Sequence, residues 1–460
     1  MGILFIAYCI NFMQVRNIFA LFIYFFLSGS LSAQNIEMNF PAFAGKAYDF
    51  IIFQGDKQVK IQHDTIPANG RFTLVVPTQY APYTGMCRWL ITNTAEGGGL
   101  DMAVPGYGFS VSCMSSKPNS ANISYNGYDA VNELNRLNQE QRVIINRFET
   151  ITHAISLYES THPLFSALQK EQRAQVLKYN KFQQDLKKNP NYNARILPIF
   201  NLNNGIAPQL SNNREDQARL VNLYITDKLN FDDLFTSGHW TSIIQSWVQL
   251  QAQVVGTKAS FVKDFNSISR RFTDANRYTD FVGKVTYFLT KYGKDDFVEA
   301  ITSTVVNSGK ITAYEGATMQ VYTKALVGSK APDIVLPDGK VMKSGELATA
   351  DYRKTLLVFF ASDCGHCEEL LKTLQVHYQS LQERHIHIVA LAADADEEIF
   401  KRSKLAFPWE DTFCDFKGML GVNFRSYAVL GTPTLVLINA KGIIELRTSK
   451  LDEVLINSKI

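Results

Sequence analysis

The sequence predicts a multidomain protein in which a small antiparallel β-sandwich is followed by an α-helical domain and then by an α/β domain. Three changes of pattern predict this order. From Ile36 to about Ser120, short runs rich in β-branched and aromatic residues are separated by turn signals. From about Asp129 to Ser308, apolar residues recur at spacings of three and four. Beyond Gly328, continuous apolar strands alternate with helical segments, which is typical of a central sheet covered on both faces.

The size and charge of the chain narrow its possible functions. With 460 residues, 46% of them hydrophobic, the chain can bury more than one core. Its 46 basic and 43 acidic side chains nearly cancel and leave a net charge of +3. Because there is no basic field and no long run of like charge, a nucleic acid partner is not expected.

The N-terminus has the pattern of an export signal. Arg16 precedes an uninterrupted apolar run from Ile18 to Leu27, and small residues then lead to a predicted cleavage after Ala33. We therefore expect residues 1–33 to be a signal peptide, although Met13 could be the true start or the segment could stay as an uncleaved anchor. No later segment has the roughly 18 to 20 continuous apolar residues of a membrane span. The expected location is the periplasm or cell envelope, where disulfides persist.

The first predicted domain, residues 34–122, consists of short strands. Cys87 and Cys113 both lie in it, and they could form a structural disulfide or remain two buried free thiols. Turn signals at Gln54-Gly55-Asp56 and Asn69-Gly70 separate the runs. The predicted strands are Tyr48 to Phe53, Lys57 to Gln62, Arg71 to Val76 and Arg88 to Thr92.

The second predicted domain, residues 123–326, is helical. Stretches such as Arg214 to Leu229 and Gly238 to Val255 are amphipathic, and breaks between such stretches suggest roughly seven helices. No catalytic constellation is visible here, and His239 beside Trp240 is expected to be a core or surface residue. A scaffold or docking surface is the expected role.

The third predicted domain, residues 329–460, begins with a hairpin and continues with alternating strands and helices. Its expected elements, in order, are strands Ile334 to Leu336, Val341 to Lys343 and Thr355 to Phe360, a helix to about Arg384, a strand from Ile386 to Ala392, a helix capped near Asp394 or Asp396, and strands Thr434 to Ile438 and Ile443 to Leu446.

Two cysteines three positions apart occur in this domain, in the stretch FFASDCGHCEELL. They stand where a buried strand gives way to a helix, whose N-terminal N–H groups and partial positive charge stabilise the thiolate of Cys364. Cys367 lies about one turn later and could close a disulfide. The pattern predicts Cys364 as the nucleophile and Cys367 as the resolving thiol. A zinc site would need two further ligands, and no second close cysteine pair supplies them.

This part of the chain resembles the thioredoxin fold, and more narrowly the TlpA/ResA class of exported thiol-disulfide oxidoreductases. The resemblance rests on the hairpin segment APDIVLPDGK from Ala331 to Lys340, the strand before the cysteine pair, and Gly-Thr-Pro-Thr at 431–434 just ahead of a strand. It implies a cis Pro433 that forms the substrate-binding loop together with Thr432. It also implies protein thiol and disulfide substrates, a membrane-bound or soluble thiol electron donor, and no bound cofactor. The two earlier domains look more loosely like the companion domains of larger exported members.

Several residues depart from the family pattern or are expected to tune the pair. Gly365 and His366 stand between the cysteines, and an imidazole there stabilises the reduced thiolate and makes the disulfide more oxidising. Asp363 occupies a position where tryptophan is common, and Val358 replaces a buried carboxylate of compact thioredoxins. Glu368 or Glu369 could replace that carboxylate, but both are expected to be solvated acids of the first helical turn. Cys414 is expected to be a buried thiol rather than a third redox cysteine.

The function that these patterns predict is an exported thiol-disulfide oxidoreductase acting on protein disulfides, with the reductase direction favoured by the resemblance. Two alternatives remain open: a disulfide oxidase or isomerase, which His366 favours, and a non-enzymatic cell-envelope binding protein that carries a thioredoxin-like module. Peroxidase chemistry is not expected, because Leu357 and Ala361 stand where peroxidatic cysteines have a proline and a threonine. The oligomeric state stays open.

Overall fold

The computed structural model describes residues 34–95, 97–314, 316–347 and 351–457. The predicted signal peptide lies outside these residues. The described residues divide into two compact units, the first comprising those up to Asn135 with Asn191–Asn193, and the second comprising Arg136–Pro190 and those from Ala194 onward.

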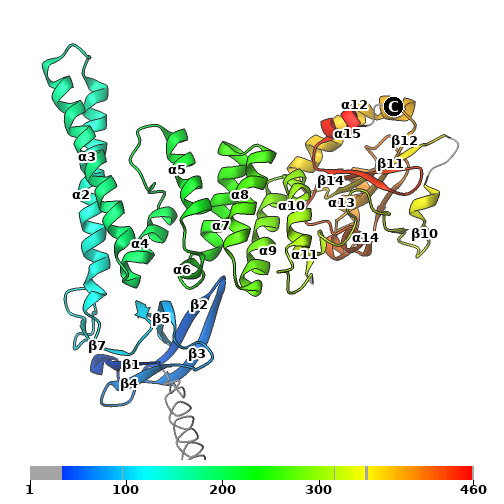
Figure 1. Ribbon diagram of the computed structural model, residues 1–460. Coiled ribbons are helices and arrows are strands. Elements are labelled where there is room, and N and C mark those ends of the chain that lie inside the picture. The colour runs from blue at the N-terminus through cyan, green and yellow to red at the C-terminus, as the bar shows by residue number, and fades with distance from the viewer. Residues whose placement is uncertain (1–33, 96, 315, 348–350, 458–460) are drawn as a thin grey trace, which may run out of the picture. The chain divides into compact units, whose positions relative to one another are not determined.

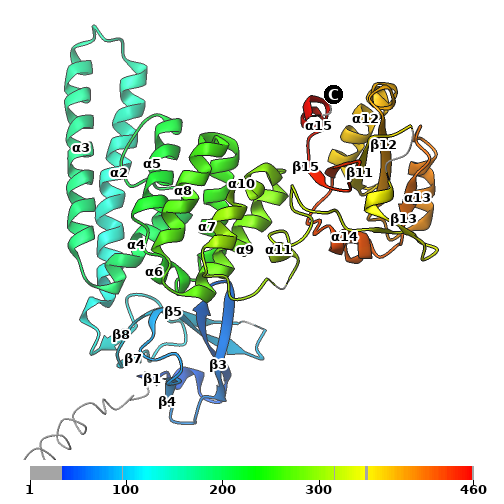
Figure 2. The same cartoon turned by 45° about the vertical axis from the view of Figure 1, so that its right-hand side comes forward.

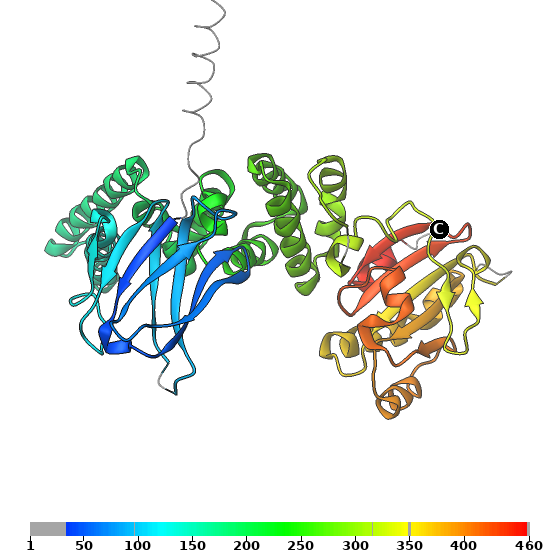
Figure 3. The same ribbon diagram turned by 90° about the horizontal axis from the view of Figure 1, so that it is seen from below.

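The first unit contains two four-stranded sheets that share one core (Figures 1 and 3). Trp89 lies at its centre, with ring centroids 4.7 Å from Phe40 and 5.6 Å from Phe72. The predicted β-sandwich is therefore present, with one difference, because β1 pairs in parallel with β7. One sheet has the order β4-β1-β7-β8 and the other β3-β2-β5-β6, with β1(Gln34–Asn39), β2(Ala47–Gln54), β3(Lys57–Thr65), β4(Arg71–Val76), β5(Thr84–Thr92), β6(Gly99–Pro105), β7(Phe109–Ser112) and β8(Ser124–Asn126).

The two cysteines of this unit are free thiols in the core. Cys87 has no exposed surface and Cys113 is 2% exposed. Burial raises the pKa of the Cys87 thiol, and Cys113 Sγ lies 3.4 Å from Asn122 Oδ1. Of the two alternatives for these cysteines, a structural disulfide or two buried free thiols, the structure shows the buried free thiols.

The helical region contains nine α-helices between Glu133 and Asn307 in the described chain, where about seven were expected (Figure 2). Several begin at side-chain caps that the sequence supplies, such as Asn213, Thr257 and Asp274. Trp240 is fully buried, and the ring of the half-buried His239 lies 5.3 Å from that of Phe200. The helices are α2(Glu133–Leu157), α3(Pro163–Lys188), α4(Tyr192–Asn203), α5(Arg214–Asp227), α6(Phe231–Phe235), α7(Trp240–Leu250), α8(Lys258–Arg271), α9(Ala275–Lys291) and α10(Asp295–Asn307).

The C-terminal region is the predicted α/β domain, built on a five-stranded sheet of order β13-β12-β11-β14-β15. Its central strand β11 is parallel to β12 and antiparallel to β14. A short α11(Ala317–Gln320) and the β9(Ile334–Val335)–β10(Val341–Met342) hairpin precede the sheet. The other elements are β11(Lys354–Phe360), α12(Gly365–Glu383), β12(Ile386–Ala392), α13(Glu397–Lys404), β13(Thr412–Cys414), α14(Val422–Ser426), β14(Thr434–Asn439), β15(Ile444–Thr448) and α15(Leu451–Asn457).

Both faces of this sheet are covered, which explains the continuous apolar sequence of β11. Leu356, Val358 and Phe360 point into a core shared with α12, α13 and α15, whereas Leu357 and Phe359 point into a second core beneath α14 and the hairpin. None of the helices in the described part of the chain is both long and apolar enough to cross a membrane.

Candidate active site

The cysteine pair stands at the N-terminus of a long helix, as predicted. Cys364 is the N-cap residue of the 19-residue helix α12, and Cys367 lies in its first turn. Cys364 is partly exposed, whereas Cys367 has no exposed surface. The two thiols interact with each other. This arrangement offers one sulfur to an incoming partner and keeps the second behind it.

The environments of the two thiols differ. Burial, reinforced by contact with Cys364, raises the pKa of Cys367 to about 12. Cys367 therefore remains a protonated thiol at neutral pH. Cys364 lies at the N-terminal, positive end of the α12 dipole.

The Gly-Thr-Pro-Thr segment lies against the pair. The Thr432–Pro433 peptide bond is cis, as the resemblance implied, and Cys364 Sγ lies 3.6 Å from the carbonyl oxygen of Thr432. Thr434 Oγ1 donates to the carbonyl of Gly431 at 2.8 Å and so braces the turn. Cys364, Cys367, Thr432 and Pro433, which are up to 69 positions apart in the sequence, thus meet at one place.

A buried arginine anchors the segment that leads into this loop. Arg447 of β15 is 9% exposed, and its guanidinium donates to the carbonyls of Tyr427 at 2.5 Å and Ala428 at 2.8 Å. Arg447 also interacts electrostatically with Asp295 and Glu299 of α10. Sequence reasoning did not find this residue, because its partners are backbone groups and acids from another region.

Asp394 holds the loop in front of the cysteines, a role that the sequence did not reveal. Its carboxylate accepts hydrogen bonds from Ser362 N at 2.8 Å and Ser362 Oγ at 2.6 Å. Of the two acids predicted as possible helix caps, Asp396 caps α13 and Asp394 does not. One signal could have found it, because Asp394 follows β12 just as Ser362 follows the neighbouring parallel strand β11, and the ends of such strands meet.

The residues predicted to tune the cysteine pair differ in how far they are exposed to solvent. Gly365 and His366 are exposed in the first turn of α12. Val358 is fully buried in the core that contains Cys367, so β11 offers no carboxylate at that position. Glu368 is exposed and forms an ion pair with Lys372 at 2.6 Å, which is the expected behaviour of a solvated helix acid.

Cys414 has the surroundings of an ordinary buried thiol. It is 4% exposed, and its Sγ lies 3.3 Å from the carbonyl of Asp394 and accepts the N–H of Phe416 at 3.4 Å. Burial raises the pKa of this thiol. Within the described ranges, no cluster of three or more His, Cys, Asp or Glu could hold a metal ion.

A cleft of about 680 Å³ lies beside the cysteine loop. Residues of both the α/β domain and the helical region line this cleft. The lining comprises Gln253, Thr290, Lys291, Tyr292, Gly293, Asp295, His366, Glu369, Leu370, Thr373, Gly431, Thr432, Pro433, Ser449, Lys450, Leu451 and Asp452.

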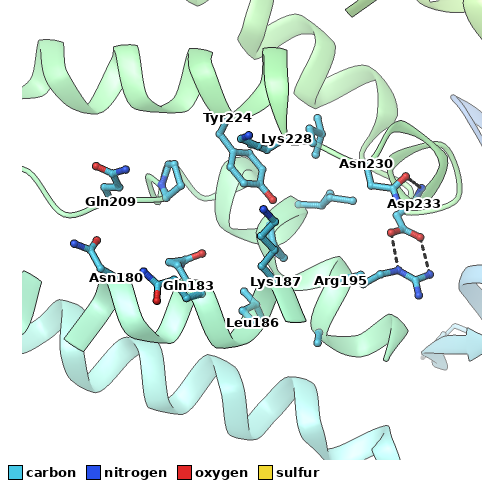
Figure 4. A pocket seen from close by; sticks show the side chains of 16 residues that line it. Asn180, Gln183, Leu186, Lys187, Arg195, Gln209, Tyr224, Lys228, Asn230 and Asp233 are labelled. Atoms are coloured by element: carbon cyan, nitrogen blue, oxygen red, sulfur yellow. Dashed lines mark hydrogen bonds and ion pairs between the residues drawn. The ribbon is translucent and has the colours of Figure 1, made fainter. Parts of the chain in front are cut away.

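A separate cavity of about 530 Å³ lies in the helical region, between α3, α4 and α5. Figure 4 shows amide side chains such as Gln183 and Gln209 along it, with Lys187 beside Tyr224. Two of its lining residues form a bidentate ion pair, in which Arg195 Nε and Nη2 lie 2.9 and 3.0 Å from the Asp233 carboxylate. The described residues that line it include no cysteine and no histidine.

Comparison with known proteins agrees with this geometry. Residues 327–447 match the AhpC/TSA family, so the C-terminal domain is an AhpC/TSA-type thioredoxin-like domain. No curated protein matches the chain.

Similar solved structures include a protein described as thiol:disulfide interchange protein DsbE from Chlorobium tepidum (28% identity, covering 29% of this chain and 94% of that chain, TM-score 0.25). A thiol-disulfide oxidoreductase from Bacteroides fragilis is also similar (27% identity, 28% and 98% covered, TM-score 0.23). A thioredoxin-like protein from Bacteroides caccae covers more of the chain (16% identity, 55% and 96% covered, TM-score 0.35).

Proposed function

We propose that this protein is an exported thiol-disulfide oxidoreductase that reduces protein disulfides through Cys364 and Cys367. The observation that carries the proposal is the pairing of a partly exposed Cys364 at a helix N-terminus with a fully buried Cys367, beside a cis-proline loop. The two cysteines carry the electrons themselves, and Thr432 and Pro433 hold the substrate.

The reaction proceeds by two thiol-disulfide exchanges. The Cys364 thiolate attacks one sulfur of the substrate disulfide and expels the other as a thiolate, which takes up a proton. Cys367 then loses its proton, attacks Cys364 Sγ and expels the first substrate sulfur, which is protonated in turn. The substrate gains two electrons and two protons, and the protein keeps a Cys364–Cys367 disulfide. A thiol electron donor then restores the dithiol.

The reductase direction is supported by the charges around the pair. A disulfide becomes more oxidising when its reduced form is stabilised as a thiolate. An acidic residue, Asp363, directly precedes the first cysteine, and burial keeps Cys367 protonated. His366, the residue between the two cysteines that can carry a positive charge, favours the opposite direction. This residue is the reason to retain an oxidase or isomerase as the second candidate.

The reduction potential of the pair decides between these directions. The protein from Gln34 onward is equilibrated against glutathione and dithiothreitol buffers, and the thiols are counted, with Cys364→Ser as the control. A potential of about −270 mV, similar to thioredoxin, would support a reductase, and a value between about −180 and −120 mV would indicate an oxidase or isomerase. If no titratable pair appeared, the non-enzymatic binding protein would replace both.

Export to the periplasm or cell envelope is the second part of the proposal, and the apolar run from Ile18 to Leu27 supports it. Fractionation of expressing cells, with mass spectrometry of the protein N-terminus, tests it. The expected product begins at Gln34 and lies outside the cytosol. A protein that retains residue 1 and stays in the cytosol would contradict it.

A further inference from the structure

The cleft beside the cysteine pair has two walls that come from different regions of the chain. One wall belongs to the α/β domain and includes His366, Glu369 and the Thr432–Pro433 loop. The opposite wall consists of the end of α9 and the start of α10, from Thr290 to Gly293 together with Asp295. A partner that reaches Cys364 along this cleft therefore meets the helical region as well.

The second wall is packed against the α/β domain. Ser449 Oγ donates to the carbonyl of Gly293 at 3.1 Å. A Cβ atom placed on Gly293 would lie 3.3 Å from Ser449 Oγ, and one placed on Gly431 would lie 3.5 Å from Thr290 Cγ2. The two glycines thus mark positions where the walls approach to van der Waals contact. The electrostatic attraction between Arg447 and Asp295 joins α10 to β15 in the same place.

The size and lining of the cleft fit a short polypeptide segment. Its volume of about 680 Å³ lies within the range of roughly 300 to 1,000 Å³ typical of sites that enclose a small ligand. Its side chains are mixed, with Lys291 and Lys450 of one charge and Glu369 and Asp452 of the other. Such a lining suits a peptide backbone with varied side chains. Because the cleft has a wall on each side, it has room for an extended segment but not for a broad folded surface.

Tyr292 is the large side chain of the second wall. It follows the last residue of α9, and its hydroxyl accepts a hydrogen bond from Gln245 Nε2 at 3.3 Å. This contact restrains the ring at the edge of the cleft. Resting on the proposed oxidoreductase function, we infer that the α9–α10 wall selects substrates: it favours disulfides on short, extended polypeptide segments and excludes those on the surfaces of folded proteins.

The test compares three substrates with the reduced protein: an unstructured peptide with an internal disulfide, a folded protein with a surface disulfide, and oxidised glutathione. The variant is Tyr292→Ala, and the matched control is Tyr287→Ala, which changes a tyrosine of α9 that is 49% exposed and does not line the cleft. We expect Tyr292→Ala to lower the ratio of peptide to folded-protein kcat/KM by about tenfold. Tyr287→Ala should leave both the ratio and the rate with oxidised glutathione unchanged.

The outcomes separate this inference from the proposed function. If wild-type protein reduced none of the three substrates, the oxidoreductase proposal would fail. If it reduced them all but Tyr292→Ala left the ratio within twofold of wild type, only the selecting wall would be refuted. Should Tyr292→Ala also lose its activity with oxidised glutathione through misfolding, Lys291→Ala, an exposed change in the same wall, decides by the same ratio.

Discussion

Replacing Asp394 with alanine should destabilise the C-terminal domain and displace the loop in front of the cysteines. The change removes the acceptor of two hydrogen bonds, from Ser362 N at 2.8 Å and Ser362 Oγ at 2.6 Å, at a carboxylate that is 6% exposed. Each hydrogen bond to a charged group contributes about 1.5 kcal/mol or more, so the expected loss is about 3 kcal/mol. Ser362→Ala removes only the hydroxyl and should cost about half as much.

Hydrogen exchange of the β11 and β12 amides, followed by mass spectrometry of peptides, measures this effect within one region of a multidomain chain. A loss of about 3 kcal/mol corresponds to an exchange rate more than a hundredfold faster for amides that open globally. Asp396→Ala is the matched control, because it removes the α13 cap and should cost about 1 kcal/mol. The double variant of Asp394 and Ser362 should lose less than the sum of the two single losses. Additive losses, or an Asp394→Ala effect below that of Asp396→Ala, would refute the reasoning.

Three further predictions concern the thiols and the charges around them. Cys364→Ser should abolish disulfide exchange, whereas Cys367→Ser should accumulate mixed disulfides with substrates, visible on non-reducing gels; equal behaviour of the two variants would contradict the assigned roles. The pKa of Cys367 is raised to about 12, so alkylation of Cys367 in the Cys364→Ser variant should stay slow between about pH 6 and 9 and accelerate only above that range. An unfolded cysteine, with a pKa of about 8.5, would react faster from that pH upward. A rise in the alkylation rate near pH 8.5 would contradict the burial of Cys367. Burial raises the pKa of Asp295, and the nearby charge of Arg447 partly offsets this increase. Between the unfolded and folded pKa values, the folded protein therefore keeps a proton that the unfolded chain releases. The stability that this group contributes is lost as the pH rises from about 4 through the folded pKa. Asp295→Asn should therefore gain stability relative to wild type across that window in thermal unfolding, and a constant difference would argue against the shift.

The parts of the fold that the sequence predicted are those set by local patterns. The apolar residues of β11, the helix that starts at Cys364 and the strand after Pro433 each have a short-range signature, and each element lies where expected. The sequence predicted that this region is helical but not how many helices it contains, because a helix as short as the five-residue α6 cannot be recognised by periodicity. The parallel pairing of β1 with β7 joins strands about 70 residues apart, and no local signal encodes such a partner.

The sequence by itself determined the order of the three regions and the identity of the cysteine pair, because both depend on residues within one or two turns or strands. Only the tertiary structure decided that Asp394 holds Ser362, that Arg447 anchors the segment before the cis-proline loop, and that the end of α9 forms a wall of the cleft. These contacts join segments tens to more than a hundred residues apart. They form only when the packed elements bring distant side chains and carbonyl groups together, so the local sequence around each residue does not predict them.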